Sequence, residues 1–285
     1  MSRSVPEITG KAQLAGVVGW PVSHSRSPSL HNYWLARHDI DGVYVPLAVR
    51  PGSFRVAMDG LRMSGFRGVN ITIPYKEEAF RYADRLDPMA ERCGSVNTLV
   101  FHPDGTSEGF STDGAGLLAS LAQEADYVPQ GRALVLGAGG AARSVAAALL
   151  ARGVDVAVSN RTFSKAEELA KILGDGMSTL PWDAWEERLG AFSLLVNTTS
   201  LGMHGGPDEE WCPDLGHASE KLIVSDIVYV PQETPLLREA QRRRLRAVGG
   251  LGMLLHQARA GFAMWFGVEP EVDEATFAHV MRGLS

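Results

Sequence analysis

Short β-rich apolar runs alternate with helical patterns along the first third of the chain. The expected strands and helices follow one another as residues 14–19, 27–38, 42–49, 53–65 and 68–74. This order of strand, helix, strand, helix and strand is typical of a parallel sheet with helical crossovers. Two further β-rich runs, 95–102 and 106–112, flank Pro103-Asp104-Gly105, a turn sequence that predicts a hairpin.

A second α/β pattern begins at Arg132. An apolar strand, a glycine turn, a long alanine-rich helix and another strand follow without a break up to Thr162, which is the layout of a dinucleotide-binding βαβ unit. Strand-like runs recur at 193–199 and 221–228. The pattern therefore predicts a Rossmann-type sheet that continues to about residue 248.

The last strongly periodic segment is 251–267. Its apolar residues at 251, 254, 255, 258, 262 and 265 have the spacing of one helix face. This periodicity predicts a helix but leaves open which of two domains it covers.

Length and charge limit the class of protein. A chain of 285 residues is long enough for two domains, and 45% hydrophobic with 21% charged residues is the balance of an ordinary globular protein. The formal net charge of −6 provides no basic field for nucleic acid. The cations Arg242-Arg243-Arg244 are too few to change this and fit a solvated last helical turn.

Cysteine usage and hydropathy exclude other classes. Cys93 and Cys212 are far apart and have no C-x-x-C spacing, which argues against a disulfide framework and a cysteine zinc site. The first twenty residues lack a continuous apolar segment, and no stretch approaches eighteen apolar residues. We expect no membrane partner and a cytoplasmic location in a bacterial type of cell.

The glycine-rich turn at residues 137–142, G-A-G-G-A-A, fits G-x-G-x-x-G/A between a strand and a helix. Such glycines let backbone N–H groups approach a pyrophosphate at the helix N-terminus. The following strand ends in Ser159-Asn160-Arg161-Thr162, without the carboxylate that usually binds the ribose of NAD. Arg161 and Lys165 instead offer cations to a 2′-phosphate, which favours NADP; the alternative is that Arg161 only caps its own helix.

Three polar positions lie next to expected strands. Lys76 follows a strand that Pro74 should end, so it either begins an ordinary solvated helix or faces a substrate at the strand end. Ser27 before Pro28 predicts an N-cap, and its hydroxyl with that of Ser25 also suits a small carboxylate. Asp113 likewise fits either a helix N-cap or a functional acid.

Taken together, the motifs resemble one family, the shikimate dehydrogenases. They occur in family order between residues 19 and 258 and read GWPVSHSRSP, NITIPYK, SVNT, STDG, GAGGAAR, SNRT, NTTSLGM, DIVYVPQETPL and GLGMLLHQA. The resemblance implies an α/β fold with an N-terminal substrate domain, 1–113 completed by C-terminal helices 251–285. It also implies a Rossmann-type NADP-binding domain, 114–250, with the active site in the interdomain cleft.

The resemblance further implies an enzyme that reversibly reduces 3-dehydroshikimate to shikimate with NADPH, on the route to the aromatic amino acids. The family's catalytic pair falls on Lys76 and Asp113. Its substrate-binding side chains fall on Ser25, Ser27, Thr72, Asn97, Tyr229 and Gln257. Its cofactor positions fall on Gly137, Ala138, Gly139, Gly140, Ala141, Asn160, Arg161, Thr162, Lys165, Ile227 and Gly250.

From these roles we hypothesise that Lys76 donates the proton that the reduced ketone needs, and that Asp113 orients the lysine. No metal is expected, because the histidines, including His24, His31 and His38, have no partners at ligand spacing. The chain has Ser111 where the family usually has Asn, which leaves open how the Asp113 loop is held.

Two rival functions are considered. A quinate/shikimate dehydrogenase would use a broader range of substrates and cofactors, which the Ser25/Ser27 pair and Arg161 argue against. A non-catalytic small-molecule sensor of the same fold would not need an intact Lys76 and Asp113. The expected assembly is a monomer or a homodimer.

Overall fold

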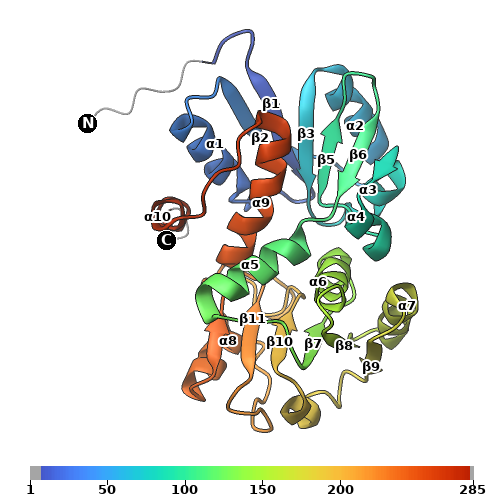
Figure 1. Ribbon diagram of the computed structural model, residues 1–285, viewed down its shortest axis with the longest axis vertical. Coiled ribbons are helices and arrows are strands. Elements are labelled where there is room, and N and C mark those ends of the chain that lie inside the picture. Colours follow the sequence, from blue (N-terminus) through green and yellow to red (C-terminus); the bar gives the residue numbers. More distant parts are fainter. Residues whose placement is uncertain (1–7, 283–285) are drawn as a thin grey trace. The chain divides into compact units, whose positions relative to one another are not determined.

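The computed structural model describes residues 8–282, which form two compact units. The N-terminal unit runs through Thr112 and takes up the chain again at Ala258, and the second unit runs from Asp113 to Gln257. Figure 1 shows one sheet in each unit. The predicted domain limits, 1–113 with 251–285 and 114–250, stay a prediction. Residues 1–7 and 283–285 lie outside the described residues. The expectation about the first twenty residues therefore falls partly outside the structure.

The N-terminal unit alternates strands and helices in the predicted order. Its strands are β1 (Gln13–Gly19), β2 (Gly42–Ala48), β3 (Phe66–Ile71), β4 (Arg85–Leu86), β5 (Thr98–Phe101) and β6 (Ser107–Phe110). Its helices are α1 (Ser27–Arg37), α2 (Phe54–Met63), α3 (Lys76–Tyr82), α4 (Pro88–Cys93) and α10 (Glu274–Met281). The sheet has the order β2-β1-β3-β5-β6-β4.

Strand direction changes within this sheet. β1 is parallel to both of its neighbours, as predicted, whereas β5 runs antiparallel to β3 and pairs with β6 in the predicted hairpin. Gly105 takes a φ of 83° in the hairpin turn, a conformation that glycine adopts without strain. The substrate-domain sheet is therefore mixed, with the parallel part at β1, β2 and β3.

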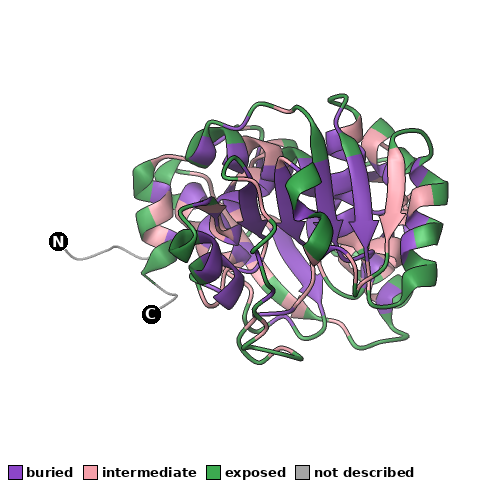
Figure 2. Cartoon of the chain, turned by 90° about the horizontal axis from the view of Figure 1, so that it is seen from below, coloured by how far each residue is buried: buried purple, intermediate pink, exposed green. Residues whose placement is uncertain are grey.

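Apolar side chains are buried between the strands and the helices that pack on them. α1 packs on β1 and β2, and α2 packs on β3. Figure 2 shows mostly buried strands, in purple, and helices with exposed outer faces, in green. The core of the N-terminal unit includes Val18, Phe54, Met58, Val69, Ile71, Tyr75, Val96 and Leu99.

The second unit is the predicted Rossmann-type sheet. Its strands are β7 (Arg132–Leu136), β8 (Asp155–Ser159), β9 (Met177–Leu180), β10 (Leu194–Asn197), β11 (Ile223–Asp226) and β12 (Arg246–Val248). Its helices are α5 (Asp113–Ala125), α6 (Gly140–Leu150), α7 (Phe163–Leu173), the short 3₁₀ helix η1 (Glu186–Ala191) and α8 (Pro235–Arg242).

All six strands of this sheet are parallel, in the order β12-β11-β10-β7-β8-β9. The strand order reverses between β7 and β10, and ligands of open α/β sheets bind at such a switch point, beyond the carboxyl ends of the strands. The fold thus predicts that a ligand binds at the loops after β7, β8, β10 and β11.

The helix expected at 251–267 is α9 (Gly250–Phe266). Leu255, Ala258, Phe262 and Trp265 are buried as the periodicity predicts. Residues from Ala258 onward belong to the N-terminal unit, where the Trp265 indole N–H donates to the Leu99 carbonyl at 3.1 Å. This settles the question that the periodicity left open: the end of α9 covers the N-terminal unit.

Candidate active site

The loops after β1 and β3 lie side by side at one edge of the N-terminal sheet. The Thr72 amide donates to the Val18 carbonyl at 2.9 Å, and the Trp20 amide donates to the Ile73 carbonyl at 3.0 Å. A Cβ at Gly19 would overlap the Thr72 methyl group, so only glycine allows this approach. The arrangement places Ser25, Ser27, Thr72 and Lys76 on loops or helix starts at the carboxyl ends of adjacent parallel strands.

Ser27 does not act as the helix cap that the sequence predicts. It is the first residue of α1, the capping position is Arg26, and no side chain makes a capping hydrogen bond there. The Ser25 hydroxyl accepts a hydrogen bond from the Ser27 amide at 3.3 Å. The capping prediction for Ser27 was therefore wrong, and its hydroxyl is not explained by helix capping.

A buried polar network that the sequence did not reveal lies behind these serines. Burial raises the pKa of Tyr44 well above its ordinary value, and a hydrogen bond with Ser27 opposes the rise. The Tyr44 phenol donates to Asn70 Oδ1 at 2.6 Å, and the Asn70 amide donates to Thr98 Oγ1 at 3.0 Å. In the sequence, Tyr44 has the position of an ordinary core residue of a strand. Its contact with Ser27 is therefore visible only in the fold.

Lys76 is the first residue of α3 and is half-buried. Glu77 and Glu78 in the same turn suit the positive end of the helix dipole, whereas a lysine at this position opposes it, at a cost of about 0.3–1 kcal/mol. The Lys76 carbonyl accepts a hydrogen bond from the Val96 amide at 3.0 Å. Lys76 therefore begins a helix, as the interpretation of an ordinary helix start requires, although its charge does not have the sign that the helix dipole favours at this end.

Asn97 follows Val96 and holds the end of the N-terminal unit. Its side-chain amide donates to Thr112 Oγ1 at 2.8 Å, while its Oδ1 accepts from the Thr112 amide at 2.8 Å. Both hydrogen bonds are buried, and Asp113 is the next residue in the chain. Asn97, predicted to bind substrate, therefore has a direct part in fixing the segment before Asp113.

The position of Ser111 is also accounted for. The Ser111 amide donates to Asp87 Oδ1 at 3.0 Å, and the Cys93 thiol donates to Ser111 Oγ at 3.4 Å. Asp87 also caps α4 through the amides of Met89 and Ala90. A backbone contact with a capping carboxylate thus holds the segment whose usual asparagine is absent.

Asp113 and Gln257 belong to the second unit. Asp113 is the buried first residue of α5, and the amide of the following Gly114 donates to Ser144 Oγ on α6 at 2.9 Å. A Cβ at Gly116 would lie 2.7 Å from the Gln257 amide nitrogen, so α5 and α9 approach closely at this point. Within one unit, glycine on α5 brings the helix of Asp113 against the buried Gln257.

The predicted glycine turn fits a dinucleotide. Gly137 follows β7 with a φ of 107°, and a Cβ there would lie 2.6 Å from Thr198 Oγ1. Gly139 precedes α6 with no side-chain cap, and a Cβ on it would meet open space. The turn therefore leaves room for a phosphate at the start of a helix that lies at the switch point of the sheet.

The residues expected to select NADP lie at the end of β8. The Asn160 side chain donates to the Thr162 carbonyl at 2.8 Å and shapes the turn. Arg161 and Lys165 are exposed, and no hydrogen bond or ion pair engages either side chain among the described residues. Thr162 occupies the N-cap of α7 without a side-chain hydrogen bond, so Arg161 is not a cap.

The fold also brings Ile227 and Gly250 together, while their part in a cofactor surface stays a prediction. The Gly250 amide donates to the Val228 carbonyl at 3.2 Å, and a Cβ on Gly250 would overlap the Ile227 carbonyl. The half-buried Tyr229 lies on the same segment.

Asp226, which the sequence did not single out, anchors this segment. Its carboxylate accepts from Thr234 Oγ1 at 2.7 Å, from the Val228 amide at 3.1 Å and from Asn197 Nδ2 at 3.0 Å. Burial raises the pKa of Asp226 to about 6, and these hydrogen bonds oppose the rise. The acid at the end of β11 in DIVYVP was the available sequence signal.

The structure was also compared with the expectations about metal sites, disulfides and membrane spans. Within residues 8–282, no group of three or more His, Cys, Asp or Glu is placed to hold a metal ion, and both cysteines are free. His31, one of three histidines considered, lies in the core. None of the helices in the described part of the chain is both long and apolar enough to cross a membrane.

Comparisons with known proteins agree with this geometry. Residues 17–99 match the shikimate dehydrogenase substrate binding domain, 120–204 match shikimate / quinate 5-dehydrogenase, and 250–275 match the shikimate 5'-dehydrogenase C-terminal domain. The shikimate dehydrogenase (NADP(+)) of Gluconobacter oxydans (strain 621H) is 52% identical over 95% of this chain and 96% of its own.

Solved structures show the same similarity. A shikimate dehydrogenase in complex with NADP+ has a TM-score of 0.90 and 33% identity, covering 98% of each chain. Shikimate 5-dehydrogenase from Thermus thermophilus, in complex with NADP(H) and shikimate, has a TM-score of 0.84 and 34% identity, covering 96% of this chain and 100% of that one.

Proposed function

This chain belongs to the shikimate dehydrogenase family, and from that premise we propose how its own residues perform the reaction. The activity is the reversible NADPH-dependent reduction of 3-dehydroshikimate to shikimate, with NADP as the cofactor. The N-terminal unit is the substrate-binding domain and the second unit is the Rossmann-type NADP domain.

The second unit holds the cofactor. Open space at Gly139 and the uncapped start of α6 receive the pyrophosphate, and the exposed Arg161 and Lys165 bind the 2′-phosphate. The surface at Ile227 and Gly250 supports the nicotinamide. When bound, NADPH supplies the hydride.

The N-terminal unit binds the substrate at the carboxyl ends of β1 and β3. Ser25 and Ser27 bind the substrate carboxylate, and Tyr229 is assigned to the same group. Thr72, Asn97 and Gln257 bind the ring hydroxyls. The support for the serine assignment is that the Ser27 hydroxyl is not a helix cap and that Ser27 is the first residue of α1, after the carboxyl end of β1.

Lys76 donates the proton that neutralises the developing alkoxide at C3 and takes it back in the oxidation direction. Asp113 is the acidic partner that orients this lysine. One observation carries the proposal: Lys76 stands at the first position of α3, where its charge opposes the helix dipole, while its backbone is pinned by Val96.

The test is turnover measured by NADPH absorbance at 340 nm. Lys76→Ala should lower kcat by about 10²- to 10⁴-fold with a smaller change in KM, as expected for a lost general acid. Arg81→Ala in the last turn of the same helix is the matched control and should keep normal turnover. Near-normal kcat in a folded Lys76→Ala protein would return Lys76 to the role of a surface residue.

A quinate/shikimate dehydrogenase remains the second candidate, because one matching family model covers both substrates. The same assay with shikimate and quinate, each with NADP+ and NAD+, separates the two. A preference for shikimate and NADP+ supports the first function, and equal use of quinate or of NAD+ supports the second. A monomer or homodimer that works in the cytoplasm stays a prediction.

A further inference from the structure

A cavity of about 650 Å³ lies at the amino ends of the N-terminal strands. Its walls come from the turn before β1, the end of α2, the start of β3 and the β5–β6 turn. The residues of the proposed active site follow the opposite, carboxyl ends of β1 and β3. Since β3 is six residues long and a strand rises about 3.3 Å per residue, roughly 20 Å separates the two regions.

The titratable lining residues of this cavity are all basic. They are Lys11, Arg62, Arg67 and His102, and no Asp or Glu is among the lining residues, all of which lie in the described part of the chain. The chain as a whole carries a net charge of −6, so a cavity lined in this way departs from the average surface. The lining side chains thus include basic groups and no carboxylate.

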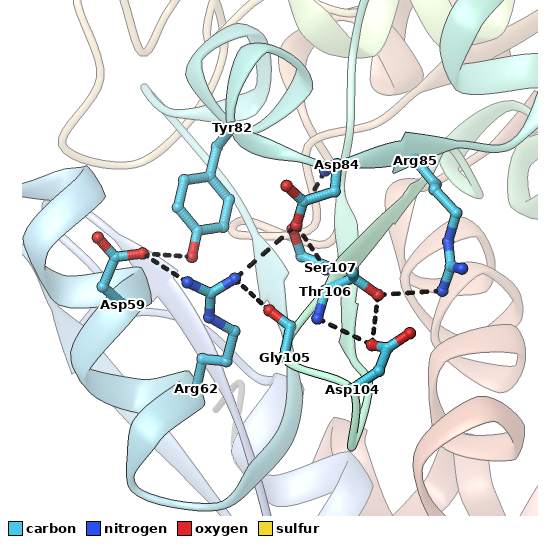
Figure 3. A network of polar contacts seen from close by, with 9 residues as sticks. All are labelled: Asp59, Arg62, Tyr82, Asp84, Arg85, Asp104, Gly105, Thr106 and Ser107. Carbon is cyan, nitrogen blue, oxygen red and sulfur yellow. Dashed lines mark hydrogen bonds and ion pairs between the residues drawn. The ribbon is translucent and has the colours of Figure 1, made fainter.

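Two of these four basic residues are already paired. Figure 3 shows Arg62 between Asp59 and Asp84, at 3.3 and 3.8 Å, with a hydrogen bond to the Gly105 carbonyl at 2.6 Å. His102 lies 3.1 Å from Glu108. Arg62 thus braces the wall between α2 and the hairpin turn, and its charge is offset by two carboxylates.

Lys11 and Arg67 are different. Among residues 8–282 no hydrogen bond or ion pair engages either charged group, and both residues are exposed. The turn that carries Lys11 is fixed instead through its backbone, whose amide donates to Thr9 Oγ1, while Thr9 bonds to Asp41. Two unpaired positive charges therefore border one cavity.

The backbone of β3 places Arg67 in this position through a bulge. Leu14 pairs with Phe66 and the next residue, Ala15, pairs with Gly68, so Arg67 is the extra residue between two registered pairs. Bulges re-aim side chains and often occur beside functional sites. An unpaired arginine on a bulge is a second, independent indication of a built site.

The cavity also has an apolar part. Phe101 is buried beneath it, Phe66 is half-buried, and Met63 is 86% exposed at the edge. Gly65 and Gly105 take positive φ values and have no atom within 4 Å of a Cβ, so both turns leave the opening unobstructed. Its size lies in the usual range for small-molecule pockets of about 300–1,000 Å³.

We propose that this cavity binds a small organic dianion, with its two charges on Lys11 and Arg67 and its apolar part on the phenylalanines. A phosphate monoester and an aromatic dicarboxylate share this chemistry. The site is separate from the NADP phosphate positions, which belong to the other unit.

The proposal is tested by titrating phenyl phosphate into the full-length protein saturated with NADP+, so that the 2′-phosphate positions are occupied. Backbone amide chemical shifts of residues 62–67 and 101–106 report on the cavity. Saturable shifts centred on these residues are expected, and they should weaken as salt is raised. Phthalate tests the dicarboxylate arm, inorganic phosphate the charge alone, and phenol the ring alone.

The double variant Lys11→Gln/Arg67→Gln should weaken phenyl phosphate binding by roughly tenfold or more, the effect of losing charged hydrogen-bond donors. Arg92→Gln, an exposed arginine on α4 outside the lining, is the matched control and should bind normally. Binding of both dianions, or of the phosphate monoester alone, supports the proposal. Equal binding of phenol, unchanged binding in the double variant, or no saturable shift with either dianion would overturn it.

Discussion

Replacing His31 with phenylalanine should make the fold less sensitive to acid, because this histidine is buried where it cannot hold a proton. The ring is fully buried on α1, stacked on Tyr44 with centroids 4.0 Å apart and surrounded by Trp34, Phe262 and Trp265. Burial lowers the pKa of His31 from 6.5 to about 3, and the nearby Asn70 side chain opposes this only in part.

The sign follows from proton linkage. Below pH 6.5 the unfolded chain binds a proton at His31 and the folded chain does not, so stability falls as the pH drops from 6.5 toward 3. At pH 5 the unfolded pKa lies 1.5 units higher, and at about 1.36 kcal/mol per unit the loss is about 2 kcal/mol. Near pH 3 it approaches about 5 kcal/mol.

The assay is urea unfolding of wild-type and His31→Phe protein at pH 8 and at pH 5, without ligands. The cost of repacking the ring is the same at both pH values and cancels in the difference, leaving a gain for the variant of about 2 kcal/mol at pH 5 relative to pH 8. His38→Phe, at the exposed end of the same helix, is measured alongside. Curves for His31→Phe that differ from wild type by equal amounts at both pH values would refute the linkage argument.

Three further predictions concern the sites. Arg161→Ser should weaken NADPH by roughly 1.5–3 kcal/mol and leave NADH almost unchanged, because it removes a charge-assisted contact to a dianionic phosphate; equal weakening of both in cofactor titrations would contradict this. Ser27→Ala should raise the KM for shikimate by about 5- to 150-fold, equivalent to 1–3 kcal/mol, whereas Ser29→Ala, in the same helix, should not; a change in melting temperature alone would point to a structural role. Asp226→Asn should cost about 1–3 kcal/mol of stability, since an amide faces donors there. The loss of stability should be larger at pH 5 than at pH 8, because the pKa of Asp226 is raised to about 6 and the wild-type fold gains stability as this carboxyl binds a proton. A smaller loss at pH 5 would contradict a raised pKa of Asp226 in the folded protein.

Local patterns predicted most of the fold because they carry strong physical constraints. The run at 132–159 combines an apolar strand, a positive-φ glycine and an alanine-rich helix, and each of these excludes most alternatives. The hairpin was predicted equally well, because Pro103-Asp104-Gly105 is a strong turn sequence. Short elements such as β4 and β12, with two and three residues, are held by their neighbours and carry no periodicity of their own.

The site was harder to predict where it depends on tertiary contacts. Ser27 looked like a cap because serine before proline satisfies the local rule, but the helix begins one residue earlier than the rule requires. The buried links from Tyr44 to Asn70 and from Asn97 to Thr112 join residues 26 and 15 positions apart. No local pattern encodes such pairs.

The return of the chain to its first unit at Ala258 has a consequence for how the protein is made. During synthesis the whole dinucleotide-binding unit, through Gln257, is complete before the substrate unit has received its last helices. Until then the Leu99 carbonyl lacks the Trp265 indole and His31 lacks Phe262 against its ring. Domains generally fold as units as they emerge from the ribosome, so the second unit has the opportunity to fold first. A chain cut short before Ala258 would retain a complete nucleotide-binding unit and leave the ring cluster of the substrate unit open to water.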